Sequence, residues 1–472
     1  MHTPQNFTIN GIAYNTTSEY TVEVTSGGFY EGRITIPKSV IYESKTYKVD
    51  AIGDDAFNEC EKLNSVSIPK TVKEIGKYAF RGCANLSKIS IPNSVISIDN
   101  FAFSCCISLS SIYIPYSVSN IKGNVFEACE NLTGLFVSTL NPTFKSSGGV
   151  LFDKTMETLI SFPTGKITGD YIIPDTVKRI GESAFADCIN LYSVSIPDSV
   201  KQIDESAFHG CFGLTNITFS NSVVNIDELT FAGCKNLRSF TIPNSVTNIE
   251  DSAFCDCENL SSITIPESVL RIGHCVFDLC PNLTNLIVNE SNPNYSSQNG
   301  VLFDKSMEKL IKFPTGKIAN HYKIPASVKE IADSAFSFSK ELVSVDIPNS
   351  VERIGRTAFT DCPDLKDVYI PDSVKIIGAM AFSNCSNLKL ITISNPATNI
   401  ECGAFYYCEN LEEFHYHSSV PYDFENEIHP ELIFKGINQS TCVLFVPKGS
   451  KQAYKSSKLW QDFENIVEEE DL

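Results

Sequence analysis

One phrase repeats through most of this chain every 23 residues, and this period constrains the fold more than any other feature of the sequence. The phrase reads Ile-Pro-x-Ser-Val, then Ala-Phe, then Cys-x-Asn-Leu, and then begins again. Its phenylalanine recurs at Phe57, Phe80, Phe103, Phe126, Phe185, Phe208, Phe231, Phe254, Phe277, Phe336, Phe359, Phe382 and Phe405. A period of about 20 to 50 residues is typical of a solenoid, in which each repeat is one coil stacked on its neighbours. The sequence therefore predicts a long shaped surface in preference to an enclosed active site.

Each repeat contains the signals that turn an extended chain into one coil. Apolar and polar residues alternate over 89–91, which is typical of a short strand. Pro92 follows and has no N–H for the next ladder bond, so it ends that strand. Ile98 and Phe103 then return to the core. We predict a right-handed, β-dominated solenoid of about fifteen coils with short helical or 3-10 turns.

The full repeat phrase is similar to that of a known family. Leu-x-x-Ile-x-Ile with Ile-Pro, Ser-Val, Ala-Phe and Cys-x-Asn-Leu resembles the BspA-like leucine-rich-repeat family of bacterial and protozoal surface proteins, over residues 50–415. The resemblance implies a leucine-rich-repeat solenoid that is surface-exposed or secreted. It also implies adhesion to host matrix glycoproteins or to other microbes. The family has no fixed site motif that could be carried over to residues of this chain.

The two ends of the chain lack the repeat and are predicted to be caps, because a solenoid end exposes apolar core. Residues 1–50 alternate apolar and polar side chains, so we expect an N-terminal β cap ahead of a solenoid at 51–415. Residues 416–472 are expected to form the C-terminal cap. This cap should contain a last strand at 443–447 and a short helix from Lys451 to about Trp460.

Two inserts, near residues 138–170 and 289–321, interrupt the spacing of the phenylalanines. Both contain Asn-Pro, then Gly-Val-Leu-Phe-Asp-Lys, then Phe-Pro-Thr-Gly-Lys-Ile, so Gly149 aligns with Gly300 and Phe162 with Phe313. This alignment indicates a duplication of the insert with its following repeats. We predict a β-hairpin in each insert. Inserts on solenoids are often binding sites, and an enlarged coil without a ligand is the alternative.

Most of the 17 cysteines belong to the repeat and are predicted to be free thiols. Twelve lie three residues after a repeat phenylalanine, and Ser339 takes the thirteenth place. Stacked coils would place them about 4.8 Å apart, but parallel side chains suit a disulfide poorly. We therefore expect small apolar core residues. Cys255 and Cys257 lack a second Cys/His pair at ligand spacing, so no zinc site is predicted.

The charge and motif content disfavour several classes of function. A net charge of -19 and a pI near 4.8 argue against nucleic acid and anionic membrane surfaces as partners. No apolar run is long enough for a membrane span, and no leader pattern opens the chain. We expect a cell-surface or secreted protein whose leader is absent from this chain. No catalytic, nucleotide-binding or calcium-binding motif is present, so we expect no enzyme activity, cofactor or metal.

Candidate ligand contacts come from the outward positions of the predicted strands. Most of this column is Ser or Thr, whereas large or chemically distinct residues stand at Tyr113, Phe136, Ile287, Tyr369 and His415. His415 is expected to be an exposed histidine on a strand near the cap. Exposed aromatic residues on a sheet suit recognition of protein or sugar. The alternative is that the two hairpins fold over Phe136 and Ile287 and bury them.

Taken with the family resemblance, these observations favour a non-enzymatic binding protein. The expected partner is a host or microbial protein or glycoprotein. The alternative is a glycan-binding protein that serves nutrient capture. Rows of aromatic residues would favour sugar, whereas a broad mixed face would favour protein.

Overall fold

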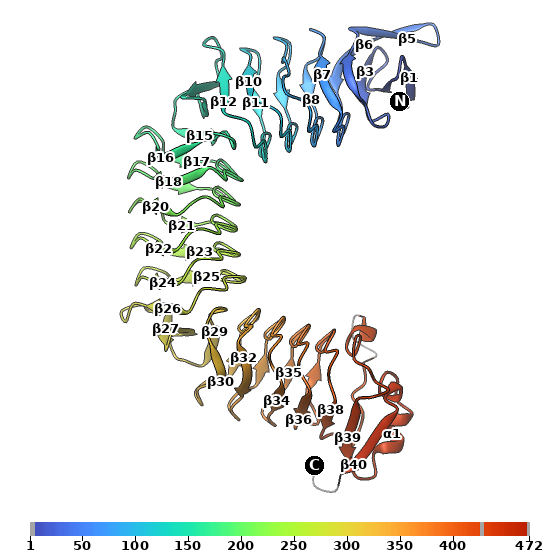
Figure 1. Cartoon of the computed structure of the whole chain (residues 1–472), viewed down its shortest axis with the longest axis vertical. Coiled ribbons are helices and arrows are strands. Elements are labelled where there is room, and N and C mark those ends of the chain that lie inside the picture. Colours follow the sequence, from blue (N-terminus) through green and yellow to red (C-terminus); the bar gives the residue numbers. More distant parts are fainter. Residues whose placement is uncertain (1–4, 425–428, 470–472) are drawn as a thin grey trace. The chain divides into compact units, whose positions relative to one another are not determined.

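The structure is a computed structural model that describes residues 5–424 and 429–469. It consists of two compact units, Met1–Leu237 and Arg238–Leu472, each a stack of β coils (Figure 1). The two units together contain about 19 turns and almost no helix. The predicted leucine-rich-repeat solenoid is therefore confirmed.

A first column of parallel strands runs along each unit, with most strands ending just before the repeat proline. In the first unit it contains β4 (Gly32–Thr35), β7 (Leu63–Ser67), β10 (Ser111–Ile114), β12 (Gly134–Val137), β16 (Thr168–Ile172), β18 (Leu191–Ser195) and β20 (Asn216–Thr218). In the second unit it contains β22 (Ser239–Thr241), β24 (Ser262–Ile265), β26 (Asn285–Val288), β30 (Ala319–Lys323), β32 (Leu342–Asp346), β34 (Asp367–Ile370), β36 (Leu390–Ile393), β38 (Glu413–Tyr416), β39 (Val443–Pro447) and β40 (Asn465–Glu469). Its outward side chains form what we call the strand face.

A second column of short parallel strands forms another side of each coil. In the first unit it contains β8 (Glu74–Ile75), β9 (Ser97–Ile98), β11 (Asn120–Ile121), β15 (Thr158–Ser161), β17 (Arg179–Ile180), β19 (Gln202–Ile203) and β21 (Asn225–Ile226). In the second unit it contains β23 (Asn248–Ile249), β25 (Arg271–Ile272), β29 (Lys309–Lys312), β31 (Glu330–Ile331), β33 (Arg353–Ile354), β35 (Ile376–Ile377) and β37 (Asn399–Ile400). The register advances by one repeat at each step, as in the pairing of Ile377 with Ile400.

The repeat phenylalanines and cysteines form the third side of the coil. The rings of Phe359 and Phe382 stack with centroids 5.0 Å apart, and both side chains are fully buried. The Cys385 thiol donates to the carbonyl oxygen of Phe359 at 3.1 Å, so it ties one coil to the next. All 17 cysteines are free and the twelve repeat cysteines are buried, which confirms the prediction of core thiols.

Thiol labelling tests this arrangement. Burial raises the pKa of Cys129 and of Cys362 to about 12, so neither forms the reactive thiolate near pH 8. Cys275 is the one exposed thiol among the described residues. Burial and the nearby Asp278 also raise the pKa of Cys275, but its exposure leaves it accessible. A thiol reagent at pH 8 is therefore expected to modify Cys275 first in the folded protein and the repeat cysteines only after denaturation. Rapid modification of many thiols in the native protein, measured by mass spectrometry, would contradict this packing.

Two details of the predicted coil are wrong. The count of about fifteen coils is too low, because β4, β39 and β40 of the two ends stack in the same column as the repeats. The predicted helical or 3-10 turns do not occur in the described repeats. The helices of the described residues all lie after the repeats, within residues 430–462. The corners instead contain residues in the left-handed region, such as Tyr78 (φ 55°) and Phe101 (φ 58°), and these interrupt any helical run.

Further strands extend the sheets at both ends of the chain. At the N-terminus, β1 (Asn6–Ile9), β2 (Ile12–Thr16), β3 (Thr21–Thr25), β5 (Ser39–Tyr42) and β6 (Lys45–Ile52) form a largely antiparallel sheet. β6 then pairs with β8 and so joins this sheet to the second column. At the C-terminus, η1 (Pro430–Leu432), α1 (Lys451–Lys455) and η2 (Trp460–Asp462) accompany β39 and β40. The helix ends at Lys455, earlier than predicted, and Leu459, with a φ of 68°, directly precedes η2.

Each insert contains three antiparallel strands, of which the sequence predicted two. β13 (Phe144–Ser147), β14 (Val150–Asp153) and β15 follow one another in the first insert, and β27 (Tyr295–Gln298), β28 (Val301–Asp304) and β29 in the second. The Asn of each Asn-Pro pair fastens its insert to the preceding coil: Asn141 Nδ2 donates to the carbonyls of Pro115 and Val118, both at 2.8 Å. The buried core is divided at these places, with one cluster from Phe7 to Leu151 and another from Val301 to Ile466.

Candidate functional site

Two aromatic side chains stand side by side on the strand face of the first unit. Tyr113 on β10 and Phe136 on β12 are partners in the parallel register, and they are 55% and 50% exposed. Gly134 lies two residues before Phe136, and a Cβ placed there would come within 2.7 Å of the Phe136 ring. The absence of a Cβ at Gly134 therefore leaves room for the end of the Phe136 ring. We call Tyr113 and Phe136 the aromatic patch.

The hairpins do not bury the strand face. In the first insert the Leu135 N–H donates to the carbonyl of Gly149 at 2.8 Å, so β14 lies against the edge of β12. The second insert repeats this contact from Leu286 N to Gly300 O at 2.9 Å. Ile287 is 48% exposed, and Phe136 remains open as described above. The alternative in which the hairpins cover these two residues is therefore wrong.

The other predicted contact residues lie in the second unit and are not brought together. Tyr369 on β34 is 54% exposed and pairs with Thr392 on β36. Ile287 on β26 pairs with Thr264 on β24. Each is thus an isolated large side chain among hydroxyl-bearing neighbours.

His415 does not match the expected exposed histidine. Its side chain is 17% exposed, because the ring stacks on Phe445 of β39 with centroids 4.2 Å apart. Its Nε2 lies 3.2 Å from the Glu413 carboxylate, and its Nδ1 lies 3.6 Å from the Glu469 carboxylate of β40. The last two strands continue the column past His415, so this residue offers little surface to a ligand.

The strand face includes an apolar residue that sequence reasoning missed. Ile172 on β16 pairs with Ser195 on β18 and is strongly exposed. The insert supplies this strand, so it was not counted among the repeats. The Ile-Pro pair at 173–174, which matches the repeat phrase, was the signal that could have located it.

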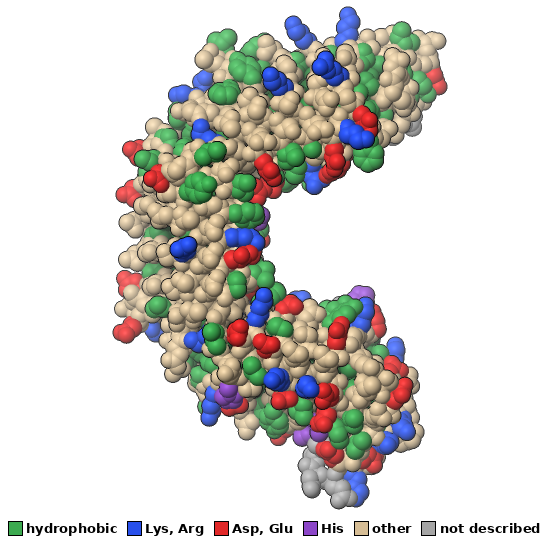
Figure 2. Space-filling model, viewed as in Figure 1, with side chains coloured by type: hydrophobic (Ala, Val, Ile, Leu, Met, Phe, Trp, Pro, Cys, Tyr) green, Lys and Arg blue, Asp and Glu red, His purple; other side chains and the backbone are tan. Residues whose placement is uncertain are grey.

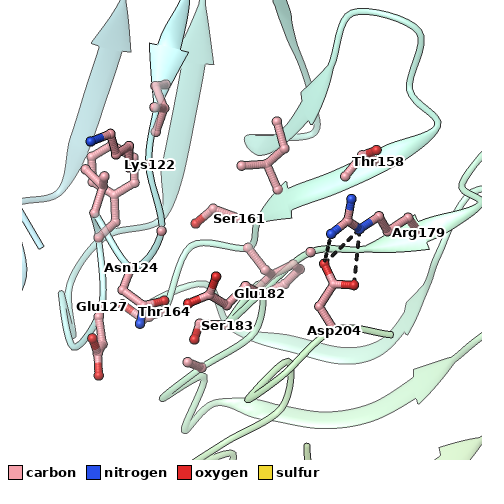
Figure 3. Close-up of a pocket in the computed structure, with 18 residues that line it drawn as sticks. Lys122, Asn124, Glu127, Thr158, Ser161, Thr164, Arg179, Glu182, Ser183 and Asp204 are labelled. Atoms are coloured by element: carbon pink, nitrogen blue, oxygen red, sulfur yellow. Dashed lines mark hydrogen bonds and ion pairs between the residues drawn. The ribbon is translucent and has the colours of Figure 1, made fainter. Parts of the chain in front are cut away.

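Each insert also leaves a cavity next to the phenylalanine side of the coil, which the sequence did not reveal. The first cavity has a volume of about 230 Å³ and is lined by residues that include Ser161, Thr164, Glu182 and Arg179 (Figure 3). The second cavity, of about 410 Å³, is lined by residues that include Lys312. Both arise where the insert follows Phe126 or Phe277.

Charges in the second cavity are neutralised by side chains of the same unit. The Lys312 ammonium is buried and ion-paired with Asp278, and it also donates to the Ser334 carbonyl and the Ser337 hydroxyl, both at 2.9 Å. Arg353 pairs with Glu330 at 3.0 Å and with Asp333 at 2.9 Å. Asp278, Glu330 and Asp333 therefore each have a basic partner.

The first cavity has a different charge balance. Arg179 pairs with Asp204 at 2.7 Å, as the dashed lines in Figure 3 show. Burial raises the pKa of Glu127, and the nearby Asp187 adds to that effect while Arg81 opposes it. Glu182 lies across the cavity from Lys122 and Asn124.

The described residues offer neither a metal site nor an enclosed serine nucleophile. Within residues 5–424 and 429–469, no group of three or more His, Cys, Asp or Glu side chains is placed to hold a metal ion. His321 contacts Ser344 at 2.9 Å and Asp346 at 3.2 Å, but His321 and Asp346 are exposed and Ser344 is only half-buried on the strand face. A serine nucleophile of this type requires an enclosed site with oxyanion donors, which an open sheet face does not provide.

The stacked parallel strands with their phenylalanine and cysteine ladders define a leucine-rich-repeat solenoid protein. The model of the BspA type leucine rich repeat region matches residues 50–168, 164–284 and 313–427. The chain therefore belongs to the BspA-type leucine-rich-repeat family, as its repeat phrase indicated. No helix in the described part of the chain combines the length and apolar character needed to cross a membrane.

Several solved structures are similar to this chain. A leucine rich cell surface protein from Faecalibacterium prausnitzii is 29% identical, with 62% of this chain and 97% of that chain covered and a TM-score of 0.43. A leucine-rich repeat protein from Bacteroides ovatus is 25% identical over 94% and 100% of the two chains, with a TM-score of 0.40. The pneumococcal vaccine antigen PcpA is 20% identical over 99% of each chain, with a TM-score of 0.46. A comparison with curated proteins finds no match.

Proposed function

We propose that this protein is a non-enzymatic binding protein, at the cell surface or secreted, whose strand face adheres to a protein or glycoprotein of a host or another cell. The observation that carries the proposal is the aromatic patch, in which two half-exposed rings stand in register on an open sheet. Aromatic side chains bury a large apolar area with little loss of side-chain freedom, so they often anchor protein interfaces. Family membership supports a binding function on a repeat scaffold.

The composition of the strand face favours a protein partner over a sugar. Apart from the aromatic patch and the separate residues Ile172, Ile287 and Tyr369, the face carries mainly hydroxyl groups and charges. Lys323 and Asp346 are in register on β30 and β32. Acidic and basic side chains are interspersed on the face of the molecule that Figure 2 shows. A broad mixed surface of this kind suits a protein, whose side chains can pair with both signs of charge.

Glycan binding for nutrient capture is the second candidate, and one observation favours it. The Phe136 ring extends toward Gly134 and is half exposed, which leaves part of the ring available for stacking on a sugar ring. A single aromatic pair is a small platform, so the protein partner remains our first proposal.

A binding screen against immobilised matrix glycoproteins and a glycan array, at two salt concentrations, tests the proposal. Saturable binding to a glycoprotein is expected. Replacing Tyr113, Phe136 and Tyr369 together by serine is expected to weaken it about 30-fold or more, which is typical of losing a hot spot of about 2 kcal/mol. All three side chains are half exposed, so the thermal midpoint should change little.

A matched variant controls for the loss of surface aromatics in general. Tyr20, Tyr116 and Phe212 are exposed but lie outside the first strand column, and serine at these three positions should leave binding unchanged. Hits on sugars alone would favour glycan capture. Undiminished binding by the strand-face variant would refute the proposed site.

A further inference from the structure

The first column of strands is interrupted at the first insert, and this leaves β16 with a neighbouring strand on one side only. β12 belongs to a two-stranded sheet with β10, whereas β16 begins a three-stranded sheet with β18 and β20. The insert contacts the edge of β12, since the Leu135 N–H donates to the Gly149 carbonyl at 2.8 Å. The Val137 N–H donates to the Ser146 hydroxyl at 3.1 Å. Among the described strands, only β18 pairs with β16.

The hydrogen-bond pattern with β18 identifies the backbone groups on the open edge of β16. Ile172 pairs with Ser195 in the parallel register, and the Ile173 N–H donates to the Ser195 carbonyl at 3.1 Å. In a β ladder, successive residues direct their N–H and C=O groups to opposite sides of the strand. Because Ile173 directs its N–H toward β18, the N–H and C=O groups of Asp170 and Ile172 face away from β18.

This edge is open and is flanked by apolar side chains. Asp170 is exposed, and a Cβ placed on Gly169 would meet no atom within 4 Å. Ile167, directly before β16, is 78% exposed, and Ile172 is 72% exposed. Natural proteins usually protect such an edge from pairing with another chain, for example with charged side chains. Two strongly exposed isoleucines have the opposite effect, because they add apolar area that a docked strand would bury.

The aligned strand of the second unit has the same backbone pattern but different side chains. The shared Phe-Pro-Thr-Gly-Lys-Ile motif aligns β30 with β16, so His321 takes the place of Asp170 and Lys323 that of Ile172. The Ile324 N–H donates to a carbonyl of β32 at 3.1 Å, so the edge of β30 exposes the equivalent backbone groups. The edge of β30 therefore carries a histidine and a lysine where the edge of β16 carries an acid and an isoleucine.

We propose that the open edge of β16 binds an extended segment of a partner protein, which joins the sheet as an added strand. The N–H and C=O groups of Asp170 and Ile172 form the backbone hydrogen bonds. An apolar residue of the segment packs beside Ile172, and a basic residue two positions away lies beside the Asp170 carboxylate. The inference deepens the proposed binding function and rests on it for the class of partner, but it does not depend on the aromatic patch.

Fluorescence anisotropy of the full chain with labelled peptides tests the proposal. The probe is the capped peptide Val-Thr-Val-Thr-Lys-Thr-Val-Thr-Val, which reads the same in both directions and so fits either strand orientation. Two further peptides are N-methylated at one or the other set of alternate residues, which removes the backbone donors from one edge at a time. Only one edge of an added strand contacts β16, so one methylated peptide should bind about tenfold more weakly or worse while the other binds like the probe.

Substitutions on the edge provide the second arm of the test. Ile172→Pro removes the edge N–H and the apolar side chain but no donor of the ladder with β18. Ile172→Lys introduces the residue of the aligned strand and keeps the backbone donor. Both variants should bind the probe about tenfold more weakly or worse. Lys323→Pro makes the matched change on β30, and this control should bind like the natural chain.

The proposal is overturned if the natural chain shows no saturable binding, if both methylated peptides bind like the probe, or if the Ile172 variants bind like the control. Self-association of the natural chain in sedimentation velocity that Ile172→Pro abolishes would assign the edge to a second copy of this chain and overturn the assignment to another protein. The serine variant of Tyr113, Phe136 and Tyr369 should bind the probe normally. Failure of the aromatic site and failure of the strand edge can therefore be told apart.

Discussion

Replacing Lys312 by methionine is expected to lower the free energy of unfolding of this protein by roughly 3–5 kcal/mol. The Asp278 carboxylate is buried and ion-paired with Lys312, so the substitution leaves a buried charge without a partner. The loss would appear as a lower midpoint in chemical denaturation followed by circular dichroism. Asp278→Asn in the Lys312→Met background should recover much of the loss, because it removes the unpaired charge.

The first insert offers the matched control for this experiment. Ser161 is the aligned position and forms no ion pair, so Ser161→Met is expected to change the free energy of unfolding by less than about 1 kcal/mol. A Lys312→Met protein as stable as the natural chain would show that the pair contributes nothing net. In that case the Lys312–Asp278 pair would not make the second insert more stable than the first.

Truncating one ring of the phenylalanine ladder, Phe208→Ala, is expected to cost about 3–5 kcal/mol. Phe208 is fully buried, and its ring stacks on Phe185 at 4.8 Å and on Phe231 at 5.5 Å. Alanine would leave a cavity between two coils that hydrogen bonds already hold in place, so the coil has little freedom to collapse around it. Denaturant titration of the purified variant measures the change.

Phe29→Ala provides the comparison for the ladder. Phe29, between β3 and β4, is strongly exposed, so its removal should shift the free energy of unfolding by no more than about 0.5 kcal/mol. Similar losses in both variants would mean that the ladder stacking is not a principal source of stability in this fold.

The sequence was sufficient to predict the solenoid because each repeated residue has a packing role that recurs in every coil. Phe359 and Cys385 are examples, since one stacks on the next ring and the other donates to the neighbouring coil. The conformation of the corners was missed for a local reason. Tyr78 and Phe101 adopt positive φ values without being glycine, and the sequence gives no signal for that.

Residues of the candidate site could be predicted only where the alternation along one strand decides whether a side chain is exposed. Alternation along β10 and β12 placed Tyr113 and Phe136 outward, and the structure leaves them open. His415 was misjudged because β39 and β40, which cover it, lack the repeat phrase. The cavities depend on contacts between distant residues, such as Lys312 with Asp278, so no local pattern could reveal them.

Under the function proposed above, in which the protein links a surface to a partner, the division of the buried core at the inserts has a mechanical consequence. Coils in a solenoid are stabilised only by their immediate neighbours, so they can unfold one after another. The clusters Phe7–Leu151 and Val301–Ile466 each meet an insert at one end, where ring stacking along the ladder begins or stops. Tension along the chain would therefore unfold one cluster while the other keeps its fold. The chain would lengthen in separate steps, and each step would dissipate part of the load before the bound partner is released.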